Sequence, residues 1–143
     1  MEFIYNDGGR SKYFKGTAGD CAVRAIAIAT GIDYLEIYNQ LKQLVGKSCR
    51  NGTPKDAGKE LLKRLGWKRV TTMKIGEGCK MHLTENEIPP GTIIVQLSKH
   101  LVCVKDKVVQ DTYNSSIKQY YDQEGNLITN DKRCVYGYWK KEA

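Results

Sequence analysis

Residues 21 to 30 form a segment that is apolar on almost every side of a predicted helix. The segment reads Cys-Ala-Val-Arg-Ala-Ile-Ala-Ile-Ala-Thr, in which Arg24 is the one charged side chain. Asp20 stands in front of it, where a carboxylate can cap a helix, and Gly31 follows it, where glycine commonly ends one. A helix that is apolar all round has to be covered by other elements, so the sequence predicts a buried central helix early in the fold.

The rest of the chain separates into helices first and strands second. A second helix is predicted from Asp33 to about Gly46, and a third begins at Thr53-Pro54 with Thr53 as its cap. Strands are expected at 3–5, 92–97, 101–104, 108–112, 117–121, 127–129 and 134–139. This order indicates an α+β fold, in which the buried helix and two further helices pack on a C-terminal antiparallel β-sheet. We expect one domain spanning residues 1–143.

The cysteines indicate a reducing environment, and the hydropathy indicates a chain without a membrane span. There are five cysteines, an odd number at wide spacings, which predicts a cytoplasmic protein without a disulfide framework. Cys79 and His82 have the spacing of two metal ligands, but no second pair completes a site, so no metal or cofactor is expected. No apolar run reaches the roughly 18 residues of a membrane span, and no secretory signal is expected at the N-terminus.

The net charge of +7 comes from 23 basic and 16 acidic residues. Three of the basic residues, Lys55, Lys59 and Lys63, are spaced to share one face of the third helix. A row of this kind is more often a solvated helix face than a nucleic-acid footprint. We therefore expect no nucleic-acid partner and no membrane partner.

Three residues far apart in the chain have the types and order of a catalytic triad. Cys21 begins the buried helix, His100 opens a strand, and Asp111 closes the next strand. If the turn between these strands is Lys105-Asp106, His100 lies directly opposite Asp111, where Cβ atoms are about 4.5–5.5 Å apart. A four-residue loop keeps this pairing, and a three-residue loop destroys it.

This arrangement predicts nucleophilic catalysis by a thiolate. The partial positive charge at a helix N-terminus and a nearby imidazolium both favour the thiolate of Cys21. His100 would transfer the proton and Asp111 would orient the imidazole ring. Each residue also has a structural interpretation, because cysteine is often a small buried hydrophobe and an aspartate often starts a turn.

At these residues the chain resembles the papain-like superfamily of cysteine peptidases, in which a cysteine begins the central helix and a histidine and an acid or amide follow on the sheet. The segments 5–10 and 19–31, with Leu65-Gly66-Trp67 and His100-Leu101-Val102, also resemble small uncharacterised proteins of bacteriophages and prophages. The resemblance implies a papain-like core and a hydrolase that cleaves peptide, isopeptide or related amide bonds. Its substrate would be a peptide or a protein. If the chain is a phage protein, the substrate would be a host protein in the host cytoplasm.

One departure from that family concerns the groups that donate hydrogen bonds to the oxyanion, the negatively charged oxygen of the reaction intermediate. Papain-like peptidases usually carry a glutamine about six residues before the cysteine, and here that position is Lys15. The backbone N–H of Cys21 can supply one donor, and Asn6, next to a glycine turn, is the candidate for the second. Arg24 needs a buried partner, for which Asp7 and Asp20 are the candidates.

Two alternatives remain open at this stage. The first is a peptidoglycan amidase resembling the NlpC/P60 and CHAP groups, which share an Asp-Cys at a helix start and a histidine hairpin. The second is a non-catalytic phage binding protein on the same fold, which the missing glutamine and the positive charge would suit.

Overall fold

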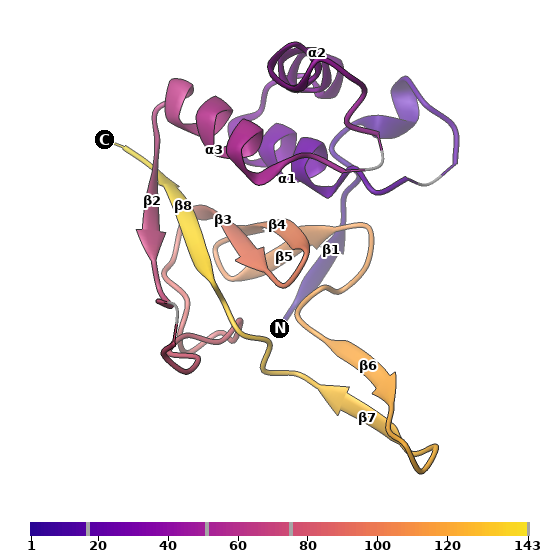
Figure 1. The fold of residues 1–143 in the computed structure, drawn as a ribbon, viewed down its shortest axis with the longest axis vertical. Coiled ribbons are helices and arrows are strands. Elements are labelled where there is room, and N and C mark those ends of the chain that lie inside the picture. The colour runs from indigo at the N-terminus through magenta and orange to yellow at the C-terminus, as the bar shows by residue number, and fades with distance from the viewer. Residues whose placement is uncertain (17, 51, 75, 143) are drawn as a thin grey trace.

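The structure, a computed structural model, describes residues 1–16, 18–50, 52–74 and 76–142 (Figure 1). The helical elements are the short 3-10 helix η1 (Arg10–Lys12), α1 (Cys21–Thr30), α2 (Tyr34–Val45) and α3 (Lys55–Arg64). The strands are β1 (Phe3–Tyr5), β2 (Trp67–Thr71), β3 (Thr92–Leu97), β4 (His100–Lys105), β5 (Val108–Asp111), β6 (Lys118–Tyr121), β7 (Leu127–Asn130) and β8 (Gly137–Lys141). The mixed α+β class expected from the sequence is confirmed.

Six of the strands form one sheet, in the order β1-β5-β4-β3-β8-β2. The pairs β5–β4, β4–β3, β3–β8 and β8–β2 are antiparallel, whereas β1 runs parallel to β5. The expected antiparallel sheet is therefore only mostly antiparallel. In the parallel pairing Tyr5 lies beside Asp111. Strand β1 therefore ends at the edge of the sheet near which α1 begins.

The helices cover one face of this sheet (Figure 1). The buried helix α1 lies against β4 and β3, α3 lies against β2, and α2 packs on the other two helices. Val23 and Ile26 of α1 are fully buried in a core that Ile94 and Trp139 of the sheet also enter. At about 25 cal/mol per Å², burial of such side chains stabilises the fold by about 1.5–3 kcal/mol each. This packing holds the first turn of α1 above the end of the sheet.

The opposite face of the sheet has its own core. Val95, Val102 and Val104 pack there against Leu83 and Val135, which belong to the connecting segments around the sheet. Because both faces are covered, the β3 and β4 strands are buried along most of their length. The continuous apolar sequence of β3 reflects this two-sided burial.

The hairpin between β4 and β5 differs from its predicted register. Its turn residues are Asp106 and Lys107, with φ of 47° and 68°, so the turn has the two positive φ angles of a type I′ hairpin. Lys105 pairs with Val108, and continuing this register places Val102, not His100, across from Asp111. The shift equals two residues along one strand. Since side chains alternate with a period of two, His100 and Asp111 still share one face as diagonal neighbours.

The third helix and the last strand begin later than predicted. The third helix begins at Lys55 with Pro54 as its N-cap, and the hydroxyl of Thr53 makes no hydrogen bond with any described residue. The last strand begins at Gly137 rather than at residue 134. The predicted strands at 117–121 and 127–129 form a separate two-stranded sheet, β6–β7, which projects from the body of the protein (Figure 1).

A disulfide joins Cys79 to Cys134, with 5.8 Å between their Cα atoms. This finding corrects the expectation that all five cysteines are reduced. The bond ties the segment before β3 to the segment before β8, where His82 also pairs with Cys134 in an isolated bridge. Cys21, Cys49 and Cys103 are free, and of these three only Cys21 is partly exposed.

Candidate active site

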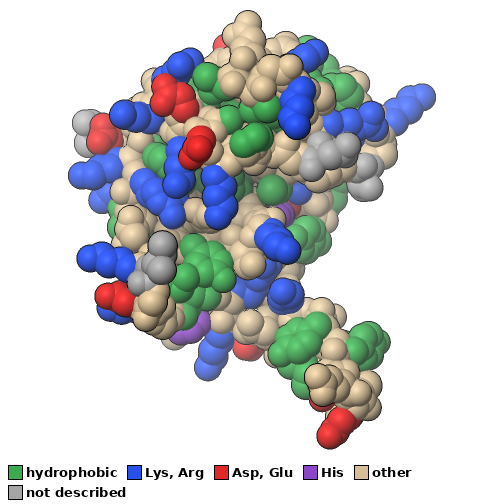
Figure 2. Space-filling model, viewed as in Figure 1, with side chains coloured by type: hydrophobic (Ala, Val, Ile, Leu, Met, Phe, Trp, Pro, Cys, Tyr) green, Lys and Arg blue, Asp and Glu red, His purple; other side chains and the backbone are tan. Residues whose placement is uncertain are grey.

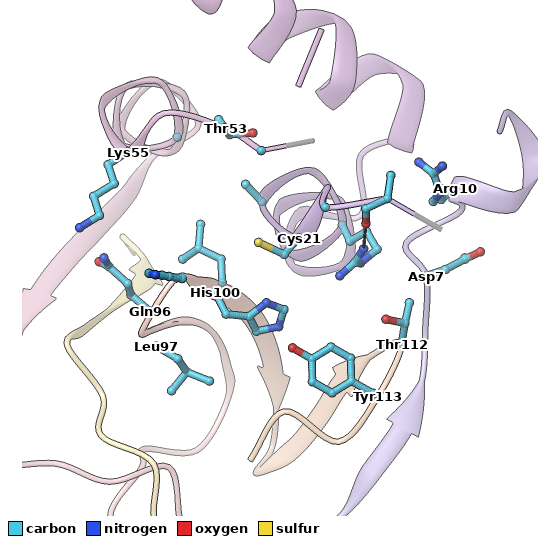
Figure 3. Close-up of a pocket in the computed structure, with 18 of the residues that line it drawn as sticks. Asp7, Arg10, Cys21, Thr53, Lys55, Gln96, Leu97, His100, Thr112 and Tyr113 are labelled. Atoms are coloured by element: carbon cyan, nitrogen blue, oxygen red, sulfur yellow. Dashed lines mark hydrogen bonds between the residues drawn. The ribbon is translucent and has the colours of Figure 1, made fainter. Parts of the chain in front are cut away.

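A pocket of about 990 Å³ opens between the helical layer and the sheet. Cys21 and His100 both line it, with Thr112 and Tyr113 towards one end and Lys55 and Gln96 towards the other (Figure 3). The sulfur of Cys21 and the imidazole ring of His100 lie in the middle of this view. The residues that the sequence singled out as nucleophile and base therefore share one cavity that a substrate can enter.

Cys21 is the first residue of α1 and its side chain is partly exposed. The first hydrogen bond of the helix is donated by the N–H of Arg24 to the carbonyl of Asp20, and the Asp20 side chain makes no cap bond. Burial acts most strongly on the thiol and favours its neutral form. The His100 ring, the N–H of Leu101 and the charge of Arg24 outweigh burial, so that the pKa of Cys21 lies below its ordinary value.

The imidazole of His100 is held by Asp111. Its Nε2 lies 2.7 Å from Oδ2 of Asp111, and both side chains are less than 10% exposed, at 9% and 4%. Because Nε2 is engaged, Nδ1 is the ring nitrogen left to exchange a proton. Burial acts most strongly on the ring and lowers its pKa, but Asp111 and Cys21 together raise the pKa of His100 to about 9.

The carboxylate of Asp111 is fixed by two more partners. The N–H of Thr112 donates to its Oδ1 at 2.7 Å, and Nη2 of Arg24 lies 3.5 Å from the same oxygen. Burial alone would raise the pKa of Asp111. The His100 ring and the Thr112 N–H reverse this effect and hold the pKa of Asp111 below its ordinary value.

Next to Cys21 lies a buried ionic cluster around Asp20. Asp20 is completely buried and accepts hydrogen bonds from Arg10, Arg24 and the hydroxyl of Tyr34. The prediction that Asp20 caps the helix through its side chain is therefore wrong, because two guanidinium groups draw the carboxylate inwards. Of the two candidate partners of Arg24, the structure selects Asp20, while the carboxylate of Asp7 accepts from nearby backbone N–H groups.

Asn6 is not placed to act as the oxyanion donor. Its side-chain N–H₂ donates to Oε1 of Gln110 at 3.3 Å, and its Oδ1 accepts from the N–H of Gly8 at 2.9 Å. The residue does not belong to the described lining of the pocket, although its neighbours Tyr5 and Asp7 do. The predicted role of Asn6 is corrected, since its amide oxygen accepts a hydrogen bond within the turn before η1.

The structure places three polar residues at the site that the sequence did not assign to it. Gln96, Arg69 and Thr53 line the same pocket, and both Nη1 of Arg69 and the hydroxyl of Thr53 are buried without a hydrogen-bond partner among the described residues. The alternation of β2 contained a signal for Arg69. It lies two residues after the buried Trp67, so both side chains face the helical layer.

Two absences concern the described residues only. In that part of the chain no cluster of three or more histidine, cysteine or acidic side chains could hold a metal ion. None of the helices placed by the structure is long and apolar enough to cross a membrane.

Comparison with known proteins adds no relative. No family model, curated protein or solved structure matches the chain. A partly exposed cysteine with a lowered pKa, an imidazole with a free Nδ1 and a buried orienting carboxylate are together equipped for nucleophilic attack by sulfur followed by proton transfer.

Proposed function

We propose that this protein is a cysteine-dependent hydrolase that cleaves a peptide, isopeptide or related amide bond. Cys21 is the nucleophile, His100 the general acid and base, and Asp111 the residue that orients the ring. The observation that supports this most strongly is the 2.7 Å contact between His100 and the buried Asp111, beside a cysteine of lowered pKa that lines the same pocket as His100. Titratable residues whose pKa values are shifted by specific neighbours at a pocket are typical of functional sites.

The proposed reaction has two halves. The thiolate of Cys21 attacks the carbonyl carbon of the substrate, the C–N bond breaks, and the imidazolium of His100 gives its Nδ1 proton to the departing amine. In the second half a water molecule gives a proton to the same nitrogen and attacks the thioester. The acid product leaves and the thiolate is restored. Throughout, Asp111 stabilises the imidazolium through Nε2.

The negative oxygen of the intermediate needs donors. The first turn of α1 offers the N–H of Cys21, because helical hydrogen bonding begins only with the N–H of Arg24. We assign the second donor to Gln96, the one side-chain amide in the described lining of the pocket. Removing one such donor typically lowers the rate by about 100- to 1000-fold. A Gln96→Ala variant should therefore lose activity by about this factor while Cys21 stays reactive.

The arrangement of elements supports a papain-like core. A helix that begins with the nucleophile packs on a mostly antiparallel sheet, and a hairpin of that sheet brings in the histidine and the acid. Two features depart from the expected pattern. Position 15 is a lysine, and Gln96 comes from a strand rather than from the segment before the helix. The assignment to this superfamily is part of the proposal.

The test is hydrolysis of a fluorogenic peptide library, with peptides of purified peptidoglycan as a separate substrate. We expect turnover by the wild type, and we expect Cys21→Ala and His100→Ala to reduce it by at least about 1000-fold. Cys49→Ala is the matched control, since it removes a free but fully buried thiol. Turnover that survives in Cys21→Ala would refute the proposal, and cleavage of peptidoglycan alone would assign the substrate to the cell wall.

A further inference from the structure

The pocket that contains Cys21 is strongly basic. Five of its lining residues carry a positive charge and form no ion pair with any described residue: Lys15, Lys55, Lys59, Arg69 and Lys99. Arg10 and Arg24 also line it, but Asp20 neutralises part of their charge, and Asp7 is the only acidic residue of the described lining. Figure 2 shows Lys and Arg side chains gathered on this face between the helical layer and the sheet. Such a pocket attracts anions.

Arg69 differs from the four lysines because it is held inside the pocket. The lysines are exposed at its rim, whereas Nη1 of Arg69 is buried without a described hydrogen-bond partner. Its guanidinium carbon lies 5.9 Å from the centre of the Trp139 ring, which supports one side of the group. Burial lowers the pKa of Arg69, so the charge is kept at a cost that a bound anion would offset.

The sheet provides a place for this guanidinium. A Cβ atom built on Gly137 would lie 2.5 Å from Nη2 of Arg69, so the side chain occupies the space that any other residue at position 137 would fill. Gly137 is paired with Gln96, and Gln96 is paired with Leu101, whose N–H faces the Cys21 sulfur. Neighbouring strands lie about 4.8 Å apart, so Gly137, over which the guanidinium lies, is two strand spacings, about 10 Å, from Leu101 beside Cys21.

This separation matches a peptide substrate. An extended chain advances about 3.3 Å per residue, so about 10 Å corresponds to about three residues from the bond under attack. We propose that Arg69 binds the carboxylate of an acidic side chain of the peptide, about three residues from the cleaved bond. The inference rests on the proposed function, and it names the substrate class of that site. A planar guanidinium suits a carboxylate because it can donate two parallel hydrogen bonds.

The test measures binding, so that it does not depend on turnover. Cys21→Ala protein labelled with ¹⁵N is titrated with acetyl-Ala-Ala-Glu-Ala-Ala-amide and with the same peptide carrying glutamine. We expect the glutamate peptide to bind about 10- to 100-fold more tightly and to shift the Nε–H signal of Arg69 and the indole signal of Trp139. Arg69→Met should bring the two affinities within about twofold of each other.

Two further variants separate position from charge. Gly137→Ala keeps the net charge but displaces the guanidinium, and it should also remove the preference for glutamate. Lys63→Met removes a positive charge of α3 that is not in the described lining, and it should leave the preference unchanged. Loss of the preference in Lys63→Met and not in Gly137→Ala would show that only the overall charge matters, which contradicts the proposal.

The remaining outcomes are also decisive. Equal binding of the two peptides, or no binding of either up to the solubility limit, overturns the role of Arg69. Tighter binding of an oligothymidylate at the same signals would assign the basic pocket to nucleic acid instead. Glutamate preference without any turnover by the wild type would keep the carboxylate site and refute the hydrolase. Turnover without such a preference would do the reverse.

Discussion

Nη2 of Arg24 lies 3.5 Å from Oδ1 of Asp111, while Nη1 of the same guanidinium binds Asp20. One side chain of α1 thereby connects the carboxylate of Asp20, the residue before the proposed nucleophile, to Asp111, the proposed orienting acid. The side chain of Arg24 is 9% exposed, so both contacts are made largely out of water. Arg24 therefore links the start of α1 to the end of β5.

Replacing Arg24 by methionine should be strongly destabilising. Two buried carboxylates would lose a partner, and breaking such a buried pair typically costs about 3–5 kcal/mol. Arg64→Met is the matched control, because Arg64 also pairs with an acid four residues earlier, Glu60, but at the surface. Exposed pairs contribute about 0–1 kcal/mol. Urea denaturation measures both, and equal losses of unfolding free energy would contradict this account of Arg24.

The pH dependence of stability should report the His100–Asp111 pair. The pKa of His100 is raised from its ordinary value of 6.5 to about 9, so the folded protein holds the proton more tightly than the unfolded chain. The stabilisation is complete below about pH 6.5 and is lost as the pH rises through about 9. Asp111→Asn removes the interaction that raises this pKa most. In this variant the unfolding free energy should therefore fall less steeply as the pH rises. Urea midpoints measured from pH 6 to 10 would show an unchanged slope if the pair did not couple to folding.

Gly8 should be required for the packing of α1 against the turn after β1. It has φ of +71°, and a Cβ atom there would lie 3.1 Å from the carbonyl oxygen of Arg24. Gly8→Ala therefore adds crowding to the roughly 1–2 kcal/mol cost of a left-handed non-glycine residue. Gly125→Ala is the control, because Gly125 has φ of +82° and a Cβ atom there would lie within 4 Å of no described residue other than its chain neighbours. Gly8→Ala should lower the unfolding temperature more than Gly125→Ala does. Equal decreases would mean that α1 moves away from the added Cβ atom without loss of stability.

Local sequence signals predicted the helix that carries the nucleophile. The apolar run after Asp20 and the glycine at position 31 give α1 the bounds observed, Cys21–Thr30. The turn of the β4–β5 hairpin was harder to predict, because Asp106-Lys107 is not one of the glycine-containing pairs that favour a type I′ turn. The error was two residues, and the alternation of side chains kept His100 and Asp111 on one face.

Long-range contacts account for what could not be predicted. Asp20 has the sequence of a helix cap, but Arg10 and Tyr34 draw its side chain into the core, and no local pattern encodes that choice. Asn6 pairs with Gln110 only because β1 and β5 run parallel. Arg69 and Gln96 reach the pocket because β2, β8, β3 and β4 lie in a spatial order that the chain order does not contain.

The alkylation rate of Cys21 at pH 6 tests the central claim most directly. If His100 lowers the pKa of Cys21, iodoacetamide should modify this residue at pH 6, where an ordinary thiol has almost no thiolate. Peptide mass spectrometry should find Cys49 and Cys103 unmodified in the folded protein, because both are completely buried.

We predict that His100→Ala slows the modification of Cys21 at pH 6 by at least about tenfold, which corresponds to one unit of thiol pKa. Rates that are equally slow in the wild type and in His100→Ala would contradict the claim that the two residues form a catalytic pair.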